Sequence, residues 1–310
     1  MAELTRRVAA PVSRRAAVAW RARRDRRART ERRLAWLLCA PAVLVMLVVT
    51  VYPVAYALVL SLQRYDLRFP DQRGWVWFDN YAALLGSEVF RADLLATVLI
   101  TVASVSLELL VGMAFALVMH RTVVARRTVR TALLLPYGLV AVVAAFAWQY
   151  AFTPELSFFT DRAWLSERWS SFAVIVATEV WQTTPLISLL LLAGLSVVPE
   201  EMLEIAEVDG ATPWQRFWRV TMPSLRPVLL VAVLFRTLDT LRVFDSVYIL
   251  TGGANGTETL SLGVWSQLVD RLNLGLGSAF SVLLFALAAL VAALFVWAFS
   301  ADIAQVGGEE

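Results

Sequence analysis

The chain of 310 residues has no lysine, one cysteine and one histidine, and each of these shortages excludes a kind of chemistry. A Walker-type loop that holds ATP needs a lysine, so this chain has no such loop. Cys39 stands alone and cannot form a disulfide within the chain. His120 has no second histidine with which to bind zinc. No nucleophile is paired with a base either, so we expect no catalytic residue, no cofactor site and no metal site.

Apolar residues are abundant instead. They make up 59% of the chain, and the mean hydropathy of +0.66 is well above that of soluble domains. An apolar segment of ~20 residues is long enough to cross a bilayer as a helix. We therefore expect an all-α membrane protein with a basic extension, 1–33, and one six-span domain, 34–310. The predicted spans are 34–62, 94–119, 131–152, 171–195, 228–250 and 276–300.

Arginine is distributed unevenly between the predicted loops. The extension, the loop 121–130 and the polar stretch 196–227 together hold 19 of the 28 arginines. The positive-inside rule then predicts that these segments and both termini lie on the cytoplasmic side of a bacterial plasma membrane. The basic extension is expected to be attracted to anionic membrane lipid. No folded nucleic-acid-binding module and no interleaved aromatics accompany it, so we expect no nucleic-acid partner.

The stretch 196–227 reads as two short helices joined by a glycine turn. Pro199 suits a helix start, and Gly210 supplies the left-handed residue that ends the first helix. Thr212 and Gln215 form a capping box that starts the second helix, and Pro223 is expected to close it. The first helix carries a small apolar face suited to docking in a groove of a partner, formed by Met202, Ile205, Ala206 and Asp209.

This stretch resembles the EAA coupling loop of ABC importer permeases. The matching residues are Glu204, Ala206, Gly210 and the pair Met222-Pro223, whereas Ile205 departs from the family's first alanine. The resemblance implies that Glu204, Ala206, Asp209, Gly210 and Pro223 couple this chain to two ABC ATPase subunits. ATP and Mg²⁺ would then be bound by those partner subunits. An ordinary helical hairpin between two spans is the alternative.

Ionisable residues inside predicted spans form a second group of candidates, because such residues usually face a partner or a water-filled path. Counted by depth, Glu108 lies near Arg236, and Glu179 near Arg242. Asp239 and Asp245 continue the series in the fifth predicted span. Two readings stay open. The charges could be structural ion pairs, with Glu108, Arg242 and Asp245 as members, or some could line a polar path for a hydroxylated solute.

The fourth predicted span contains Trp181, Gln182 and Thr183 close before Pro185. An aromatic face with polar neighbours is typical of a sugar site, although a proline-kinked structural helix explains the pattern equally well. By position, the maltose-type permeases of the ABC importer family hold their solute at matching levels of two spans. That resemblance implies a substrate path formed by Glu179, Trp181, Gln182, Thr183, Arg236, Asp239 and Thr240.

Further motifs extend the resemblance to the maltose-type permeases over about 34–300. They are Pro41 with Tyr52-Pro53, Phe78–Tyr81, and Thr251–Gly253, while 117–122, 236–239 and 273–278 are similar to trehalose importers of the family. The resemblance implies a type I importer permease for a disaccharide such as trehalose. It also implies a second permease, expected to be a different chain, and an extracytoplasmic sugar-binding lipoprotein.

Three other function classes stay open at this stage. The chain could be an ABC permease for another solute, such as glycerol phosphate. It could be a secondary, ion-coupled transporter that uses its membrane carboxylates as relays, although no internal repeat is visible. It could also be a structural or signalling membrane subunit, which would show no solute-dependent flux.

Overall fold

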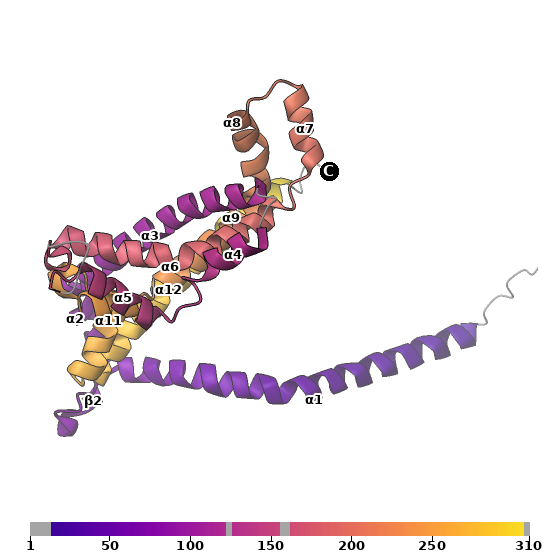
Figure 1. Cartoon of the computed structure of the whole chain (residues 1–310). Helices are drawn as coiled ribbons and strands as arrows, with labels where there is room; N and C mark the ends of the chain where they lie inside the picture. The colour runs from indigo at the N-terminus through magenta and orange to yellow at the C-terminus, as the bar shows by residue number, and fades with distance from the viewer. Residues whose placement is uncertain (1–13, 122–125, 156–161, 307–310) are drawn as a thin grey trace, which may run out of the picture. The chain divides into compact units, whose positions relative to one another are not determined.

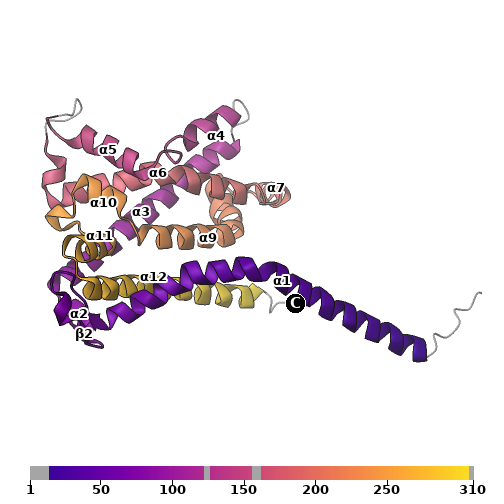
Figure 2. The same cartoon turned by 90° about the horizontal axis from the view of Figure 1, so that it is seen from below.

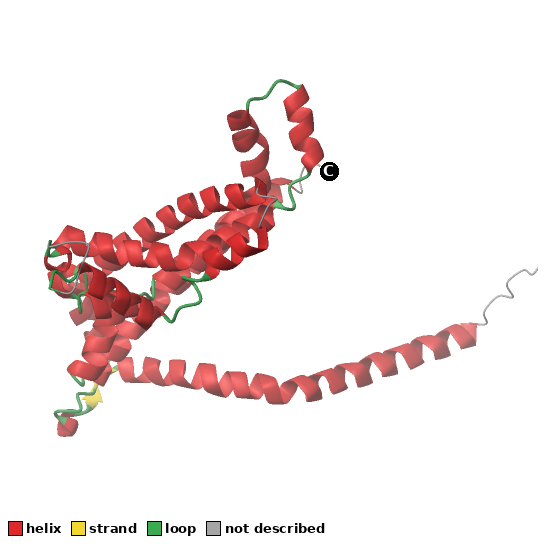
Figure 3. Ribbon diagram, in the orientation of Figure 1, coloured by secondary structure: helices red, strands yellow, loops and turns green. Residues whose placement is uncertain are grey.

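The structure is a computed structural model that describes residues 14–121, 126–155 and 162–306. The described chain is almost entirely helical, with one short hairpin (Figure 3). It divides into two compact units, Met1–Tyr56 and Ala57–Glu310, which are considered separately.

The first unit holds most of helix α1, Arg14–Ser61, whose last turn belongs to the second unit. The part Trp36–Ser61 is apolar and long enough to span a membrane. Its side chains from 36 to 56 are exposed within this chain, as expected for a helix surrounded by lipid or by other subunits. The helix continues through Pro41 and Pro53.

The second unit is a helical bundle with two recognisable ends (Figures 1 and 2). Helices α7 and α8 stand at one end, which we call the insert end, while α2 and strand β2 lie at the other, the hairpin end (Figure 1). The long helices that run between these ends are α3, Glu88–Arg121; α6, Arg168–Leu195; α9, Met222–Thr240; and α12, Leu274–Val306. The shorter elements are β1, Gln63–Arg64; η1, Pro70–Gln72; β2, Gly74–Trp75; α2, Asp79–Gly86; α4, Arg126–Leu134; α5, Ala141–Phe152; η2, Trp164–Ser166; α7, Glu200–Val208; α8, Pro213–Arg216; η3, Phe217–Thr221; α10, Asp245–Leu250; η4, Ala254–Gly256; α11, Leu260–Trp265; and η5, Ser266–Asp270.

Five helices of the described chain are long and apolar enough to cross a membrane, rather than the six predicted. The predicted span 131–152 is wrong as a single helix, because a turn separates α4 from α5. Pro136 and Gly138 lie in that turn, and both residues disfavour a continuous helix. The predicted span 228–250 is also displaced. Its helix begins at Pro213, ends at Thr240, and resumes as the short α10.

Backbone groups freed by these breaks find partners from distant parts of the chain. The side-chain amide of Gln182 donates to the backbone carbonyl of Leu139 in the α4–α5 turn, at 3.2 Å. The hydroxyl of Thr259 donates to the carbonyl of Val243 in the α9–α10 break, at 3.1 Å. Non-helical backbone is tolerated at membrane depth where such partners exist. The two breaks are therefore part of a satisfied tertiary structure.

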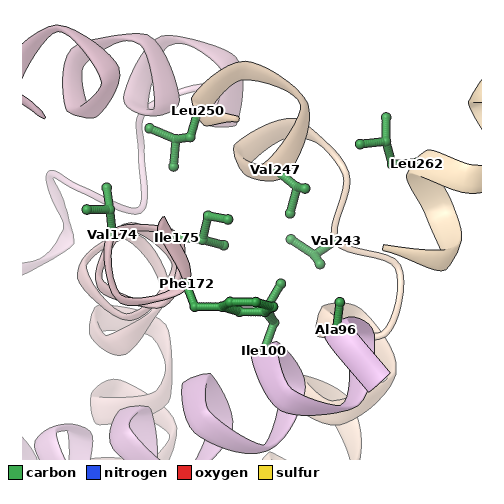
Figure 4. Close-up of a cluster of buried hydrophobic side chains, with 9 residues drawn as sticks. All are labelled: Ala96, Ile100, Phe172, Val174, Ile175, Val243, Val247, Leu250 and Leu262. Atoms are coloured by element: carbon green, nitrogen blue, oxygen red, sulfur yellow. The ribbon is translucent and has the colours of Figure 1, made fainter. Parts of the chain in front are cut away.

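The bundle is built around α3 and α6, which pack along their lengths. Gly112 of α3 allows the close approach, since an added Cβ would lie 3.0 Å from Ile187 and 3.4 Å from the backbone of Ser188. Toward the hairpin end, α3 and α6 share an apolar cluster with α10 and α11 (Figure 4). Its buried members are Ala96, Ile100, Phe172, Val174, Ile175, Val243, Val247, Leu250 and Leu262. This cluster fixes α10, and with it Ser246, against α6.

The stretch between α6 and α9 forms the expected helix pair, with one correction. Pro223 does not close the second helix, because α8, the π-helical turn η3 and α9 follow one another without interruption. Pro223 is the second residue of α9, directly after η3, and lies inside this continuous helical run. The second helix of the insert is therefore also a membrane helix.

Candidate functional site

Arg236 is the centre of a buried charge cluster inside the bundle. Its guanidinium binds Glu108 of α3 through two hydrogen bonds, Nε to Oε2 at 2.6 Å and Nη2 to Oε1 at 2.9 Å. Nη2 also donates to Oε2 of Glu179 on α6, at 2.8 Å. Nη1 donates to Oδ2 of Asp239, one turn further along α9, at 2.5 Å. A planar guanidinium suits this task because its donors point in fixed directions.

Two hydroxyls complete the cluster. Thr183 of α6 donates to Oε1 of Glu108 at 2.7 Å, and Ser246 of α10 donates to Oε1 of Glu179 at 2.7 Å. The cluster therefore joins α3, α6, α9 and α10. Charge-assisted hydrogen bonds of this kind are stronger than neutral ones. Four helices are thus held together at one level of the membrane domain.

The cluster is uneven in charge and in exposure. One guanidinium faces three carboxylates, so two formal negative charges are uncompensated by the cations described here. The Glu108 side chain is fully buried, that of Glu179 is 13% exposed and that of Asp239 is 50% exposed. The acidic surplus thus extends from the α3–α6 interface to the bundle surface. There it could accept hydrogen bonds from a hydroxylated solute or from a partner.

The expected contact between Glu108 and Arg236 is present, but the expected contact between Glu179 and Arg242 is wrong. Glu179 binds Arg236 instead. Arg242 is exposed and lies beyond the end of α9, because the helix stops at Thr240. Asp245 is half-buried in the first turn of α10. Neither residue forms an ion pair with another described residue, so their predicted role as ion-pair partners lacks a contact in this chain.

The predicted sugar residues of α6 point to three different surroundings. Trp181 is 39% exposed and lines an open apolar hollow. Gln182 donates to the backbone at the α4–α5 turn, and Thr183 belongs to the charge cluster. Thr240 is buried, and its hydroxyl donates to the carbonyl of Arg236. The three consecutive residues are thus not gathered around one cavity.

The hollow beside Trp181 has a volume of about 470 Å³ and is almost wholly apolar. Trp148 of α5 meets Trp181 edge to face, with ring centroids 6.0 Å apart, and stacks on Phe152 at 5.5 Å. Trp148, Phe152 and Ser246 were not predicted as site residues from the sequence. The only signal for Trp148 was its place in a predicted span, and the neutral Ser246 carried no signal beside the charged Asp245.

The insert is a compact helix pair with a fixed turn. Gly210 has φ of 80°, in the left-handed region, and a Cβ added there would meet nothing within 4 Å. The capping box at Thr212 and Gln215 is formed in both directions. An ion pair between Glu207 and Arg216 links the two helices. The capping box and the ion pair therefore fix the residues on both sides of the turn, while the space around Gly210 is free.

The predicted docking face of α7 is accessible in this chain. Met202 and Ile205 are 49% and 62% exposed, and Glu204 and Asp209 are exposed as well. Ala206 is half-buried. Trp214 and Trp218 add exposed aromatic surface to the second helix of the insert. Such exposed apolar side chains at the insert end favour contact with another protein.

Curated relatives cover nearly the whole chain. The trehalose transport system permease protein SugA of Mycobacterium tuberculosis is 46% identical over 284 residues, 90% of this chain and 92% of that protein. The trehalose/maltose transport system permease protein MalF of Thermococcus litoralis is 36% identical over 83% of this chain and 90% of that protein.

A solved structure supports the fold. The permease fold recurs in the bacterial alginate ABC transporter in complex with its alginate pentasaccharide-bound periplasmic protein, with a TM-score of 0.75 and 18% identity over 86% of this chain and 93% of that one. Residues 108–305 also match the family described as binding-protein-dependent transport system inner membrane component. This match contains the charge cluster and the insert. The chain therefore belongs to the inner-membrane permeases of binding-protein-dependent transport systems, and it is a transport subunit rather than an enzyme.

Proposed function

We propose that the chain is one of two permease subunits of an ATP-driven importer for a disaccharide, with trehalose as the leading candidate. The observation that carries the substrate is the 46% identity to a trehalose permease over nine-tenths of the chain. The second relative, 36% identical, is a trehalose/maltose permease. The exposed aromatic hollow at Trp181 and the acidic and hydroxyl groups around Arg236 are both features that a sugar can use, because sugars present apolar faces and many hydroxyls.

The distribution of the arginines supports the proposed orientation, with the insert end in the cytoplasm. Two ATPase subunits then dock on the exposed face of α7, through Glu204, Ala206, Asp209 and the turn at Gly210. ATP and Mg²⁺ belong to those subunits. A sugar-binding lipoprotein delivers the solute at the hairpin end, and a second permease, expected to be a different chain, completes the path.

The connection between the insert and the charge cluster suggests how docking drives transport. From Pro213 to Arg236 the chain runs as one continuous helical rod, about 35 Å long at ~1.5 Å per residue. The other arm of the insert leads back to α6, which carries Glu179 and Thr183. Both arms thus meet at the charge cluster. A movement of the insert is transmitted along two helices that the cluster ties together, as alternating access by rigid-body rocking requires.

The proposed substrate path runs along the exposed side of the charge cluster. Asp239 and Glu179 accept hydrogen bonds from sugar hydroxyls, while Trp181 covers an apolar face of the sugar. Arg236 positions both carboxylates directly. Thr183 acts through Glu108, Thr240 binds the carbonyl of Arg236, and Gln182 holds α6 to the α4–α5 turn, so we place these residues behind the path rather than in contact with the solute.

The proposal is tested by uptake of labelled trehalose into vesicles that contain the complete transporter, beside maltose and glycerol phosphate. We expect ATP-dependent trehalose uptake, and we expect Trp181→Ala to lower it without changing sugar binding by the external protein. Leu190→Ala is the control, because Leu190 is an apolar residue of α6 that lies outside both the charge cluster and the hollow at Trp181. Uptake of only a non-sugar solute would overturn the disaccharide assignment, and uptake driven by an ion gradient without ATP would establish a secondary transporter.

A further inference from the structure

The loop between α1 and α2 presents aromatic side chains that the proposed transport mechanism does not use. Within Gln63–Phe78, which we call the hairpin segment, Trp75, Trp77 and Phe78 are 57%, 63% and 70% exposed. Phe69 is 54% exposed at the other side of the loop. Exposed aromatic residues at this density on one short loop indicate a surface that is covered in the working protein.

Hydrogen bonds fix the backbone of the hairpin segment, and its aromatic side chains remain exposed on this fixed backbone. Strands β1 and β2 pair antiparallel, and the amide of the buried Asn80 donates to the carbonyls of Ser61 and Gln63 at 2.8 and 2.9 Å. Trp77 has φ of 50°, an uncommon conformation for so large a residue. Its N–H nevertheless donates to the carbonyl of Leu62 at 3.0 Å. A bulky side chain in a strained position is a feature that points to function.

The segment is fastened to the ends of two membrane spans. It begins two residues after Ser61, the last residue of the span Trp36–Ser61. It also binds the start of the span that opens at Leu274, because the N–H of Gly275 donates to the carbonyl of Tyr65 at 3.0 Å. The backbone of the segment lies directly against the start of this span, since a Cβ on Gly275 would lie 2.2 Å from the carbonyl oxygen of Gln63. The aromatic side chains therefore lie at the level where the spans end.

One ion pair is closed within the segment, while Arg64 and Asp71 are exposed and form no ion pair with another described residue. Arg68 binds both carboxylate oxygens of Asp66, at 3.0 and 2.6 Å, and this contact lowers the pKa of Asp66. Arg73 donates twice to Gln63 and lies over the ring of Tyr65 at 4.3 Å. Trp169, in the first turn of α6 at the same end of the bundle, is 70% exposed as well. Exposed tryptophans at the ends of several spans are typical of the membrane–water interface.

We propose that the hairpin segment is a lipid anchor, whose aromatic side chains lie in the headgroup region of the bilayer and fix the ends of α1 and α12 at that depth. The occupant is the phospholipid interface itself. The exposed tryptophans at the ends of the spans favour this occupant.

The test is depth measurement by spin labelling of the complete transporter in phosphatidylcholine–phosphatidylglycerol vesicles. The single native cysteine is first removed as Cys39→Ser, and the label is placed at Phe78→Cys, where the backbone φ of −94° is ordinary. Asp71→Cys, on the exposed turn η1 of the same loop, is the matched control. We expect the label at 78 to be relaxed more by oxygen than by a water-soluble nickel chelate, and the label at 71 to show the reverse.

A second variant guards against a local disturbance at the labelled residue. Trp77→Asn keeps a residue that tolerates the left-handed backbone but removes the indole, and it should shift the label at 78 toward the accessibility measured at 71. Equal access of nickel to both labels would overturn the proposal. Protection of the label at 78 only when the sugar-loaded binding protein is added would also overturn it, by identifying a protein contact. Low access of both reagents would do the same, by showing that another subunit covers the loop.

Discussion

Removing the charge of Arg236 should destabilise the bundle more than any other single change in the charge cluster. Its guanidinium makes hydrogen bonds to three carboxylates, and its side chain is 3% exposed. Breaking a buried ion pair by removing one partner costs about 3–5 kcal/mol, because the other charge is left buried. Arg236→Gln strands the fully buried Glu108 and leaves two further carboxylates beside it, so we expect a loss at the upper end of that range.

Substitutions of the residues that contact Arg236 or Glu108 should cause smaller losses of stability, with which the loss in Arg236→Gln can be compared. Glu108→Gln leaves Arg236 with two carboxylate partners, so the loss should be smaller than for Arg236→Gln. Thr183→Val removes one hydrogen bond to Glu108, and it should lower the free energy of unfolding by about 1 kcal/mol. The double variant Glu108→Gln, Arg236→Gln should be less destabilised than the sum of the two single variants, because no charged pair is left half-formed at Glu108.

The free energy of unfolding can be measured for each variant by steric trapping in bicelles, with uptake of labelled sugar as the functional readout. The refuting result is clear. If Arg236→Gln destabilised the protein no more than Thr183→Val, the buried cluster would not hold the four helices together.

Four further predictions follow from local geometry. Gly210→Leu should leave the insert folded but weaken coupling to ATP hydrolysis, whereas Gly210→Asn, which tolerates the left-handed backbone, should stay near wild type in an ATPase assay. Gly263→Ala should lower the unfolding temperature, because its Cβ would lie 2.7 Å from the ring of Phe280 and overpacking of this kind costs about 1–3 kcal/mol. Gly86→Ala is the control, because a Cβ at Gly86 would meet nothing within 4 Å, and an equal effect of the two substitutions would refute the argument. Thr212→Ala should remove the capping box and cost about 1 kcal/mol, seen as faster proteolysis of the insert. Burial raises the pKa of Glu258 above its ordinary 4.5, so the folded protein holds this proton more tightly than the unfolded chain. Stability should therefore fall as pH rises from about 4.5 through the raised pKa, and Glu258→Gln should make that slope shallower in thermal unfolding.

The sequence was most predictive where local rules decide the structure. Apolar length located the long helices, and the spacing of Gly210, Thr212 and Gln215 anticipated the insert, because turns and caps depend on a few adjacent residues. The contact of Glu108 with Arg236 followed from depth alone. The turn and the cap depend on interactions close in sequence, whereas the ion pair required only that depth be counted along two regular helices, α3 and α9.

Tertiary structure decided the rest. Nothing in 241–244 marks the end of α9, since the segment has no glycine or proline. The break depends on Thr259 and on the apolar cluster around Val247, which lie elsewhere in the chain. This break carries Arg242 away from Glu179, so the pairing inferred from an unbroken helix was wrong. The turn at Pro136 and Gly138, by contrast, was marked by its residues and was overlooked within an apolar run.

The acidic surplus around Arg236 also bears on which solutes can pass. Three carboxylates and one guanidinium leave two formal negative charges at one level of the membrane domain. An anionic solute about 8 Å away would meet a repulsion of about 2 kcal/mol for each of these charges, at an effective dielectric constant of about 20. A neutral solute meets no such barrier. On the proposed substrate path, this cluster would therefore discriminate by electrostatic potential as well as by shape, and against phosphorylated solutes in particular.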